Sequence, residues 1–290
     1  MTDNAPVKIG ILKLGCIGAA PLLDYIFDER ADREDIEVRG FSSGAKMDEQ
    51  SGMAALKYLA EYHPQLVMVI SPNAATPGPT KMRDELQKLS IPVITISDAP
   101  SKKAFYTKNE KGKSVPSPPE GQGFIVLNAD SMIGARREFL DPTEMILFNS
   151  DMLKVLSISG SIRLIQKTID GIIADIAAGK KPTLPTLTVD SKLAVEYAGF
   201  TNPYAKAKAL AAAQTAEAVA DLTVEGCFKV HDAEKYVPLV ASAHEMLRTA
   251  ARLADEAREI EKGSDSITRT PHASDGTILH KTKLGEKPSK

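Results

Sequence analysis

The sequence is poor in the residues that support base stacking, disulfides or membrane spans. It has no tryptophan and only 5% aromatic residues, so a platform for stacking nucleic-acid bases is not expected. No apolar run reaches about 18 residues, which excludes a transmembrane helix, and the N-terminus lacks a signal-peptide pattern. The only two cysteines, Cys16 and Cys227, are too few for a cysteine-ligated metal and suit a reducing compartment. We therefore expect a cytoplasmic protein that binds no membrane.

Charge and sequence motifs exclude further classes. The net charge of -2, without a long basic stripe, does not favour nucleic-acid binding. His244-Glu245 is followed by Arg248 where a zinc protease would need a second histidine, so no metal site is predicted. There is no Walker loop, recognisable Ser-His-Asp series or paired-carboxylate motif, and no catalytic residue is predicted. The 43% hydrophobic and 26% charged residues among 290 are typical of a soluble globular protein.

The first half of the chain alternates strand and helix patterns. Short runs rich in valine and isoleucine predict buried parallel strands, and amphipathic segments between them predict covering helices. The fold class is therefore α/β, with a mostly parallel sheet flanked by helices. The polar stretch 101–123 has no clear periodicity and is read as a lid, an oligomer contact or disorder. The strands are expected at 8–12, 36–41, 66–70, 92–96 and 124–127, and the helices at 17–28, 48–62 and 80–88.

The second half predicts a helix bundle. Asp141, Pro142 and Glu144 form a strong helix start, and we expect that helix to continue to residue 178 with a bend at Gly160. Further helices are expected at 202–220 and 233–262, and a small hairpin at Asp275-Gly276 in the polar tail. The predicted division is an α/β domain at 1–140, a helix bundle at 141–262 and a C-terminal tail with a small β segment at 263–290.

The first turn of the chain resembles an incomplete dinucleotide-binding fingerprint. Gly15 and Gly18 stand in register, but Lys13 occupies the place of the first glycine. The second predicted strand is followed by 42–46, which offers no carboxylate for a ribose. This pattern disfavours nicotinamide cofactors. It leaves open a different phosphate-bearing ligand at a helix N-terminus or a simple strand-to-helix turn.

Small, polar or glycine-bearing segments follow all five predicted strands. In open α/β sheets, ligands bind beyond the carboxyl ends of the strands, so these segments favour a ligand crevice over ordinary polar surface loops. Lys13, Lys46, Arg136 and Arg137 would supply positive charge for a carboxylate or phosphate. The two arginines could instead form surface ion pairs with nearby acids. The five segments are 13–18, 42–46, 71–73, 97–100 and 128–130.

Two further residues have both a functional and a structural interpretation. His244 lies on an apolar helix face, where a hydrogen-bonded core histidine is more common than a catalytic base. Glu225 lies between two predicted helices and could contact a ligand or be an ordinary loop acid. Neither residue type is a specific signal by itself, and the residues alone indicate only a protein that binds an anionic organic ligand.

Several unbroken segments, in one order along nearly the whole chain, resemble the coenzyme F420-dependent methylenetetrahydromethanopterin dehydrogenases. The segments are 23–35, Pro72-Asn73 with Pro77-Gly-Pro79, 134–142, 236–238 with 241–246, and 269–273. The resemblance implies reversible hydride transfer between methylenetetrahydromethanopterin and coenzyme F420, an 8-hydroxy-5-deazaflavin that dissociates as a cosubstrate. It also implies no metal, no tightly bound flavin, a homohexamer built as a trimer of dimers, and a place in methanogenesis or related one-carbon metabolism.

The resemblance also implies which ligand each candidate residue would contact. When methylenetetrahydromethanopterin gives up a hydride it becomes a methenyl cation, and carboxylates at Glu225, Asp98 and Asp130 would stabilise that positive charge. The family pattern leads us to expect asparagine where Cys16 stands and glycine where Ser101 stands, which puts one ligand hydrogen bond and the lid in question. The alternatives are a nicotinamide-dependent methylene dehydrogenase and a non-catalytic binding protein of the same fold. The expected coenzyme contacts are Lys13, Gly15, Cys16, Gly18, Ser43, Lys46, Pro72, Asn73, Asp98, Ala99, Pro100 and Arg136, and the expected substrate contacts are Asp130, Arg137, Glu225, His244 and Glu245.

Overall fold

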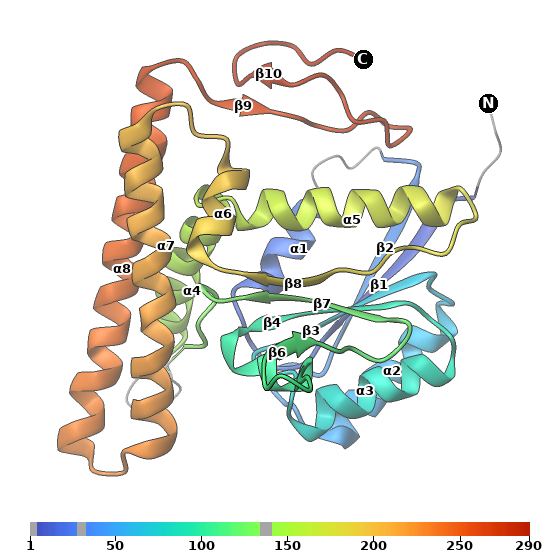
Figure 1. Ribbon diagram of the computed structural model, residues 1–290, viewed down its shortest axis with the longest axis horizontal. Helices are drawn as coiled ribbons and strands as arrows, with labels where there is room; N and C mark the ends of the chain where they lie inside the picture. The colour runs from blue at the N-terminus through green and yellow to red at the C-terminus, as the bar shows by residue number, and fades with distance from the viewer. Residues whose placement is uncertain (1–4, 28–32, 134–140) are drawn as a thin grey trace.

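A computed structural model describes residues 5–27, 33–133 and 141–290, and its central element is a six-stranded parallel sheet (Figure 1). The strand order is β2-β1-β3-β4-β7-β8, and every neighbouring pair is parallel. Strands β3, β4 and β7 are buried along their whole length, which explains why they read as continuous apolar runs. The strands are β1 (Val7–Lys13), β2 (Ile36–Ser42), β3 (Leu66–Ser71), β4 (Val93–Asp98), β7 (Gln122–Leu127) and β8 (Thr186–Val189).

Helices cover both faces of the sheet. Helices α1 (Ala19–Phe27) and α5 (Ser161–Ala177) share one apolar core with alternate residues of β1, β3, β4 and β7. Helices α2 (Glu49–Glu61) and α3 (Pro77–Lys88) pack on the opposite face. Figure 1 shows α5 crossing one side of the sheet while α2 and α3 lie on the other. This arrangement follows from the strand period of two, which sends successive side chains to opposite faces.

The remaining long helices form the predicted bundle. Helix α4 (Pro142–Ile158) packs against α8 (Ala233–Gly263), and α7 (Pro203–Val224) runs beside α8 as a hairpin (Figure 1). A π-helical turn, η3 (Glu225–Lys229), joins α7 to α8. Buried alanines along α7 and α8 allow the two backbones to approach closely. These alanines are Ala205, Ala209, Ala212, Ala213 and Ala216 in α7, and Ala243, Ala250, Ala251, Ala254 and Ala257 in α8.

The α/β class, the bundle and the C-terminal β segment are confirmed. Asp141 begins α4 as predicted, with its carboxylate accepting from the backbone N–H of Thr143 (2.8 Å) and Glu144 (3.4 Å). The tail forms the antiparallel strands β9 (Thr268–Arg269) and β10 (Thr282–Lys283), with a tighter turn around Asp275-Gly276. The domain division at residues 140 and 262 stays a prediction.

Three local predictions need correction. The helix from residue 141 is not merely bent at Gly160, because that residue has φ 102° and α4 ends before it. Only glycine adopts this backbone conformation readily, so α5 starts as a separate helix and turns onto the sheet. The expected first helix begins at Ala19, two residues late. The polar stretch 101–123 is ordered, since it holds the end of the 3₁₀ helix η1 (Ala99–Ala104) and the hairpin of β5 (Tyr106–Lys108) with β6 (Ser114–Pro116), so the disorder reading is wrong, while the lid and oligomer-contact readings stay predictions.

The sequence reading also missed β8 and α6 (Ser191–Ala198), which lie between α5 and α7. β8 adds a sixth parallel strand beside β7. Among the described residues, no helix has the length and apolar character needed to cross a bilayer.

Candidate ligand site

A cavity of about 460 Å³ lies beyond the carboxyl ends of β1 and β2, between α1 and α4. It borders the point between β1 and β3 where the strand order reverses, since the chain goes from β1 outward to β2 and then back to β3 on the other side, and Ile70 of β3 is part of its wall. This is the place at which open α/β sheets bind ligands. The walls come from β1 to β3 (Ile11, Lys13, Gly40, Phe41, Ser42, Ile70), from the first turn and α1 (Cys16, Ile17, Ala20, Pro21, Asp24) and from α4 (Met145, Ile146, Asn149, Ser150, Leu153).

Lys13 provides positive charge at this cavity. It is the last residue of β1, it is half-buried, and it lines the cavity together with Cys16 of the following turn. No ion pair or hydrogen bond of its ammonium group is formed within residues 5–27, 33–133 and 141–290. A half-buried ammonium group in an otherwise largely apolar cavity favours an anionic or carbonyl oxygen on the ligand.

The turns after β1 and β2 are fastened to each other by short backbone contacts. Ser43 donates its N–H across to the carbonyl of Lys13 (3.1 Å), and within its own turn it donates its hydroxyl to the carbonyl of Lys46 (2.6 Å). Gly15 donates its N–H to the carbonyl of Gly44 (3.1 Å). These bonds position Lys13 and Cys16 from the neighbouring loop. The side chain of Lys46 is exposed and does not line the cavity.

Gly18 begins the turn into α1 beside the carboxylate of Asp130. Asp130 comes from the loop after β7 and is fully buried. Its two oxygens accept the backbone N–H groups of Gly18 (2.9 Å) and Ala19 (2.8 Å). A Cβ at residue 18 would stand 2.5 Å from Cγ of Met152 and 2.7 Å from Oδ1 of Asp130, so only glycine fits. Burial raises the pKa of Asp130, against the effect of the two N–H groups.

Asp98 is a second buried carboxyl group close to Asp130. It ends β4 and is 2% exposed, and Ser101 Oγ lies 3.4 Å from its Oδ1. Burial, with the charge of Asp130 as a smaller cause, raises the pKa of Asp98 to about 8. At neutral pH Asp98 is therefore mostly an uncharged acid, which weakens its case as the counter-ion of a cationic product.

Predicted contacts Pro72 and Asn73 lie in the loop after β3, which is tied to the loop after β4. Ser101 Oγ accepts the N–H of Ala74 (2.8 Å), and Ser97 donates its hydroxyl to the carbonyl of Ser71. Ala99 and Pro100 begin η1 directly after Asp98. None of the four predicted contacts in these two loops lines the 460 Å³ cavity, although all lie at the carboxyl edge of the sheet.

The same loop is supported from α3 by a buried arginine. The guanidinium of Arg83 donates to the carbonyl of Ala74 (2.8 Å) and to Oγ1 of Thr80 (3.2 Å), and it lies over the ring of Phe105. Burial lowers the pKa of Arg83 to about 10, so the group stays charged at neutral pH. The sequence reading did not single out Arg83.

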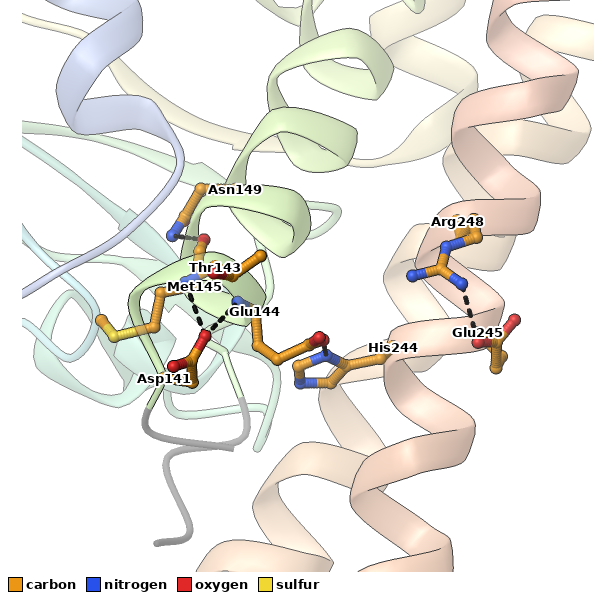
Figure 2. Close-up of polar contacts among 8 residues, drawn as sticks. All are labelled: Asp141, Thr143, Glu144, Met145, Asn149, His244, Glu245 and Arg248. Atoms are coloured by element: carbon orange, nitrogen blue, oxygen red, sulfur yellow. Dashed lines mark hydrogen bonds and ion pairs between the residues drawn. The ribbon is translucent and has the colours of Figure 1, made fainter. Parts of the chain in front are cut away.

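Helix α4 separates His244 from the cavity. Figure 2 shows Glu144 reaching toward His244 of α8, while Met145 and Asn149 lie on the other side of α4. His244 is 9% exposed, with Nδ1 3.9 Å from Oε2 of Glu144. Burial lowers its pKa, and the Glu144 charge opposes this shift.

The other predicted residues lie apart from the cavity or outside the described residues. Glu245 is exposed and pairs with Arg248 (3.0 Å) on α8 (Figure 2). Glu225 is exposed in η3, at the end of the α7–α8 hairpin. Arg136 and Arg137 lie outside the described residues.

Sequence reasoning missed the wall formed by α4. Met145, Asn149 and Leu153 recur every fourth residue and form one stripe on that helix, beside Ile146 and Ser150. The spacing could have been found, but nothing in it indicated which helix face would meet the sheet. Among the described residues, no group of three or more His, Cys, Asp or Glu could hold a metal ion.

Comparison with known proteins assigns the chain to a family. Residues 7–289 match the family model described as methylene-5,6,7,8-tetrahydromethanopterin dehydrogenase. The chain belongs to this family. The F420-dependent methylenetetrahydromethanopterin dehydrogenase of Archaeoglobus fulgidus is 58% identical over 282 residues, covering 97% of this chain and 99% of the relative. That of Methanothermobacter thermautotrophicus is 51% identical with the same coverage.

A solved structure gives the same assignment. It is that of an F420-dependent methylene-tetrahydromethanopterin dehydrogenase in complex with methylene-tetrahydromethanopterin and coenzyme F420. It superposes with a TM-score of 0.89 at 43% identity, covering 98% of this chain and 100% of the solved one. The family resemblance inferred from the sequence is confirmed.

Proposed function

We propose that this protein is an oxidoreductase that transfers a hydride reversibly between methylenetetrahydromethanopterin and coenzyme F420. The observation that carries the proposal is the solved relative with both ligands bound, which matches 98% of this chain at 43% identity. A relative this similar over its whole length shares its fold, not merely one motif.

We place the deazaflavin ring of the coenzyme in the cavity. Its volume of about 460 Å³ is within the range usual for small-molecule sites. Ile11, Ile17 and Ile70 supply apolar walls, and Lys13 and Asn149 supply polar groups. We assign Lys13 and Cys16 to coenzyme contacts, supported from behind by Gly15 and Ser43. When bound, the deazaflavin supplies the ring carbon that accepts or returns the hydride.

The task of the protein in this reaction is to hold two organic partners face to face and keep water out. Direct hydride transfer between carbon centres requires no acid or base from the protein in that step. The fastened turns after β1 and β2 fix one wall of the cavity, and α4 fixes the opposite wall. We propose that the methanopterin meets the coenzyme at the carboxyl edge of the sheet, near the loops that contain Asn73 and Asp98.

Assembly and cellular setting form part of the same proposal. Family resemblance supports a homohexamer, a cytoplasmic location and a role in methanogenesis or related one-carbon metabolism. Sedimentation of the purified protein tests the first of these, and a monomer at working concentration would contradict it.

The decisive experiment follows the absorbance of oxidised coenzyme F420 during incubation with methylenetetrahydromethanopterin. We expect bleaching that requires both compounds, and re-oxidation when the methenyl compound is added to the reduced coenzyme. A folded protein that binds both ligands without turnover would instead be a binding protein. Turnover with a nicotinamide and none with F420 would favour the nicotinamide-dependent alternative.

A further inference from the structure

The N-terminus of α1 is already occupied by a carboxylate of the chain itself. Asp130 reaches it from the loop after β7, more than a hundred residues along the chain, and accepts the N–H groups of both Gly18 and Ala19 at 2.9 and 2.8 Å. The carboxyl group is 0% exposed. The absence of a side chain at residue 18 allows it to approach this closely.

This position has a known use in related architectures. The first strand-to-helix turn of a doubly wound sheet aims the free N–H groups of its helix at a ligand phosphate, and the helix dipole favours the negative charge. Here a carboxylate takes both donors and the favourable end of the dipole. A ligand phosphate at the same point would find no free donor at these two residues and would approach a buried acid.

We propose that Asp130 is a specificity-determining residue that fills the phosphate position at α1 and thereby rejects dinucleotides whose pyrophosphate would bind there. The inference rests on the proposed function for the identity of the preferred coenzyme. It assigns Asp130 to positioning within the site and not to contact with the substrate.

The backbone N–H groups left for a ligand are those of the two residues that precede Gly18. The N–H groups of Cys16 and Ile17 have no acceptor among the described residues, and both residues line the cavity. Ser191, at the start of α6, shows the same kind of capping, since its N–H donates to Glu217 at 2.5 Å. Glu217 does not line the cavity and offers a matched control.

Amide hydrogen exchange on the wild-type protein tests the proposal directly. Gly18 and Ala19 are expected to be protected without ligand and to stay unchanged when inorganic pyrophosphate or coenzyme F420 is added. With F420, protection should rise at Cys16 and Ile17. A gain of protection at Gly18 and Ala19 on adding pyrophosphate would overturn the proposal.

A variant test uses inhibition of the F420 reaction by pyrophosphate. Asp130→Ala frees both donors, and we expect pyrophosphate to compete with F420 at least about tenfold more strongly than in the wild type. Asp130→Asn keeps the space filled and should gain less. The Glu217→Ala protein should be inhibited by pyrophosphate to the same extent as the wild type.

Unchanged inhibition in Asp130→Ala, in a protein that still turns over F420, would also overturn the proposal. If Asp130→Ala fails to fold, the exchange experiment decides alone. If the wild type shows no F420 turnover, the proposed function fails, whereas the response of Gly18 and Ala19 to pyrophosphate is still measured independently.

Discussion

The carboxylate of Glu144 lies 3.9 Å from Nδ1 of His244, and this contact joins α4 to α8 (Figure 2). The ring of Phe148 packs on the same imidazole, with centroids 4.9 Å apart. Because the opposite side of α4 lines the cavity, the contact connects the bundle to the candidate ligand site. His244 thus helps to hold α4 against α8, although it does not reach the cavity.

The protein should lose stability in mild acid through His244. Burial lowers the pKa of this histidine below its ordinary value, so the unfolded chain binds a proton more readily than the folded chain. The stability associated with neutral His244 is therefore present above the ordinary value and is lost as pH falls through the folded value. Melting curves between pH 7 and 5 should show a smaller decline for His244→Gln than for the wild type. The exposed histidine variant His231→Gln should decline like the wild type, and equal slopes for all three proteins would contradict the prediction.

Asp98 should make the protein less stable as the pH rises, the opposite of the effect of His244. Burial raises its pKa from 3.8 to about 8, so the folded state retains a proton that the unfolded state has released. The resulting stability is complete below about pH 4 and is lost as pH rises through about 8. Asp98→Asn, which resembles the neutral acid, should be more stable than the wild type at pH 9 by on the order of 1–3 kcal/mol. Denaturant unfolding at pH 6 and pH 9 measures this, with the exposed Asp84→Asn as control; a wild type as stable at pH 9 as the variant would count against it.

Removing the Lys13 ammonium should weaken coenzyme binding. If the charge-assisted contact in the proposed site is real, Lys13→Met should cost about 1.5–3 kcal/mol, seen as a rise of roughly tenfold or more in KM for F420. Lys46→Met removes an exposed charge that does not line the cavity and should change this KM by less. Steady-state kinetics with saturating methylenetetrahydromethanopterin separates the two. Equal effects of both variants would mean that Lys13 acts only through the overall charge.

Two glycine substitutions should change the stability of the protein in opposite directions. Gly18→Ala places a Cβ within 2.5 Å of Met152 and 2.7 Å of Asp130, and the resulting overpacking should cost about 1–3 kcal/mol. Gly171→Ala lies in α5, where a Cβ would meet nothing within 4 Å, and should stabilise by about 0.5–1 kcal/mol. Thermal melts of the two variants test the pair. A Gly18→Ala protein as stable as the wild type would contradict this prediction, because it would show that the side chains of Met152 and Asp130 can move to make room for the added methyl group.

Local patterns predicted most of the fold. The apolar runs of β3, β4 and β7 identified those strands, since strands buried on both faces read as continuous hydrophobic segments. β8 was missed because Thr186–Val189 has only four residues and is only partly buried. The separate direction of α5 was missed because a left-handed Gly160 cannot be told from an ordinary helical glycine without knowing what packs nearby.

The site was predictable only where loops follow strands. Lys13 and Cys16, which line the cavity, could be predicted because the carboxyl edge of a parallel sheet can be inferred from strand order along the chain. The α4 wall depends on how α4 (Pro142–Ile158) docks on α1 (Ala19–Phe27), far earlier in the chain, and no local pattern reports that contact. Asp130 was predicted as a substrate contact, and its bonds to Gly18 and Ala19 join residues too far apart in the chain for any local pattern to indicate them.

The placement of α5 has a consequence for how the chain folds as it is synthesised. The apolar residues Ile94, Ile96, Ile125 and Leu127 share their core with α5, which leaves the ribosome only after residues 5–133 have emerged. Until then this face of the sheet has no complete cover, and a nascent chain halted before α5 would expose an adhesive surface. The nascent chain should therefore stay prone to aggregation until all of α5 (Ser161–Ala177) has left the ribosome and can cover this face.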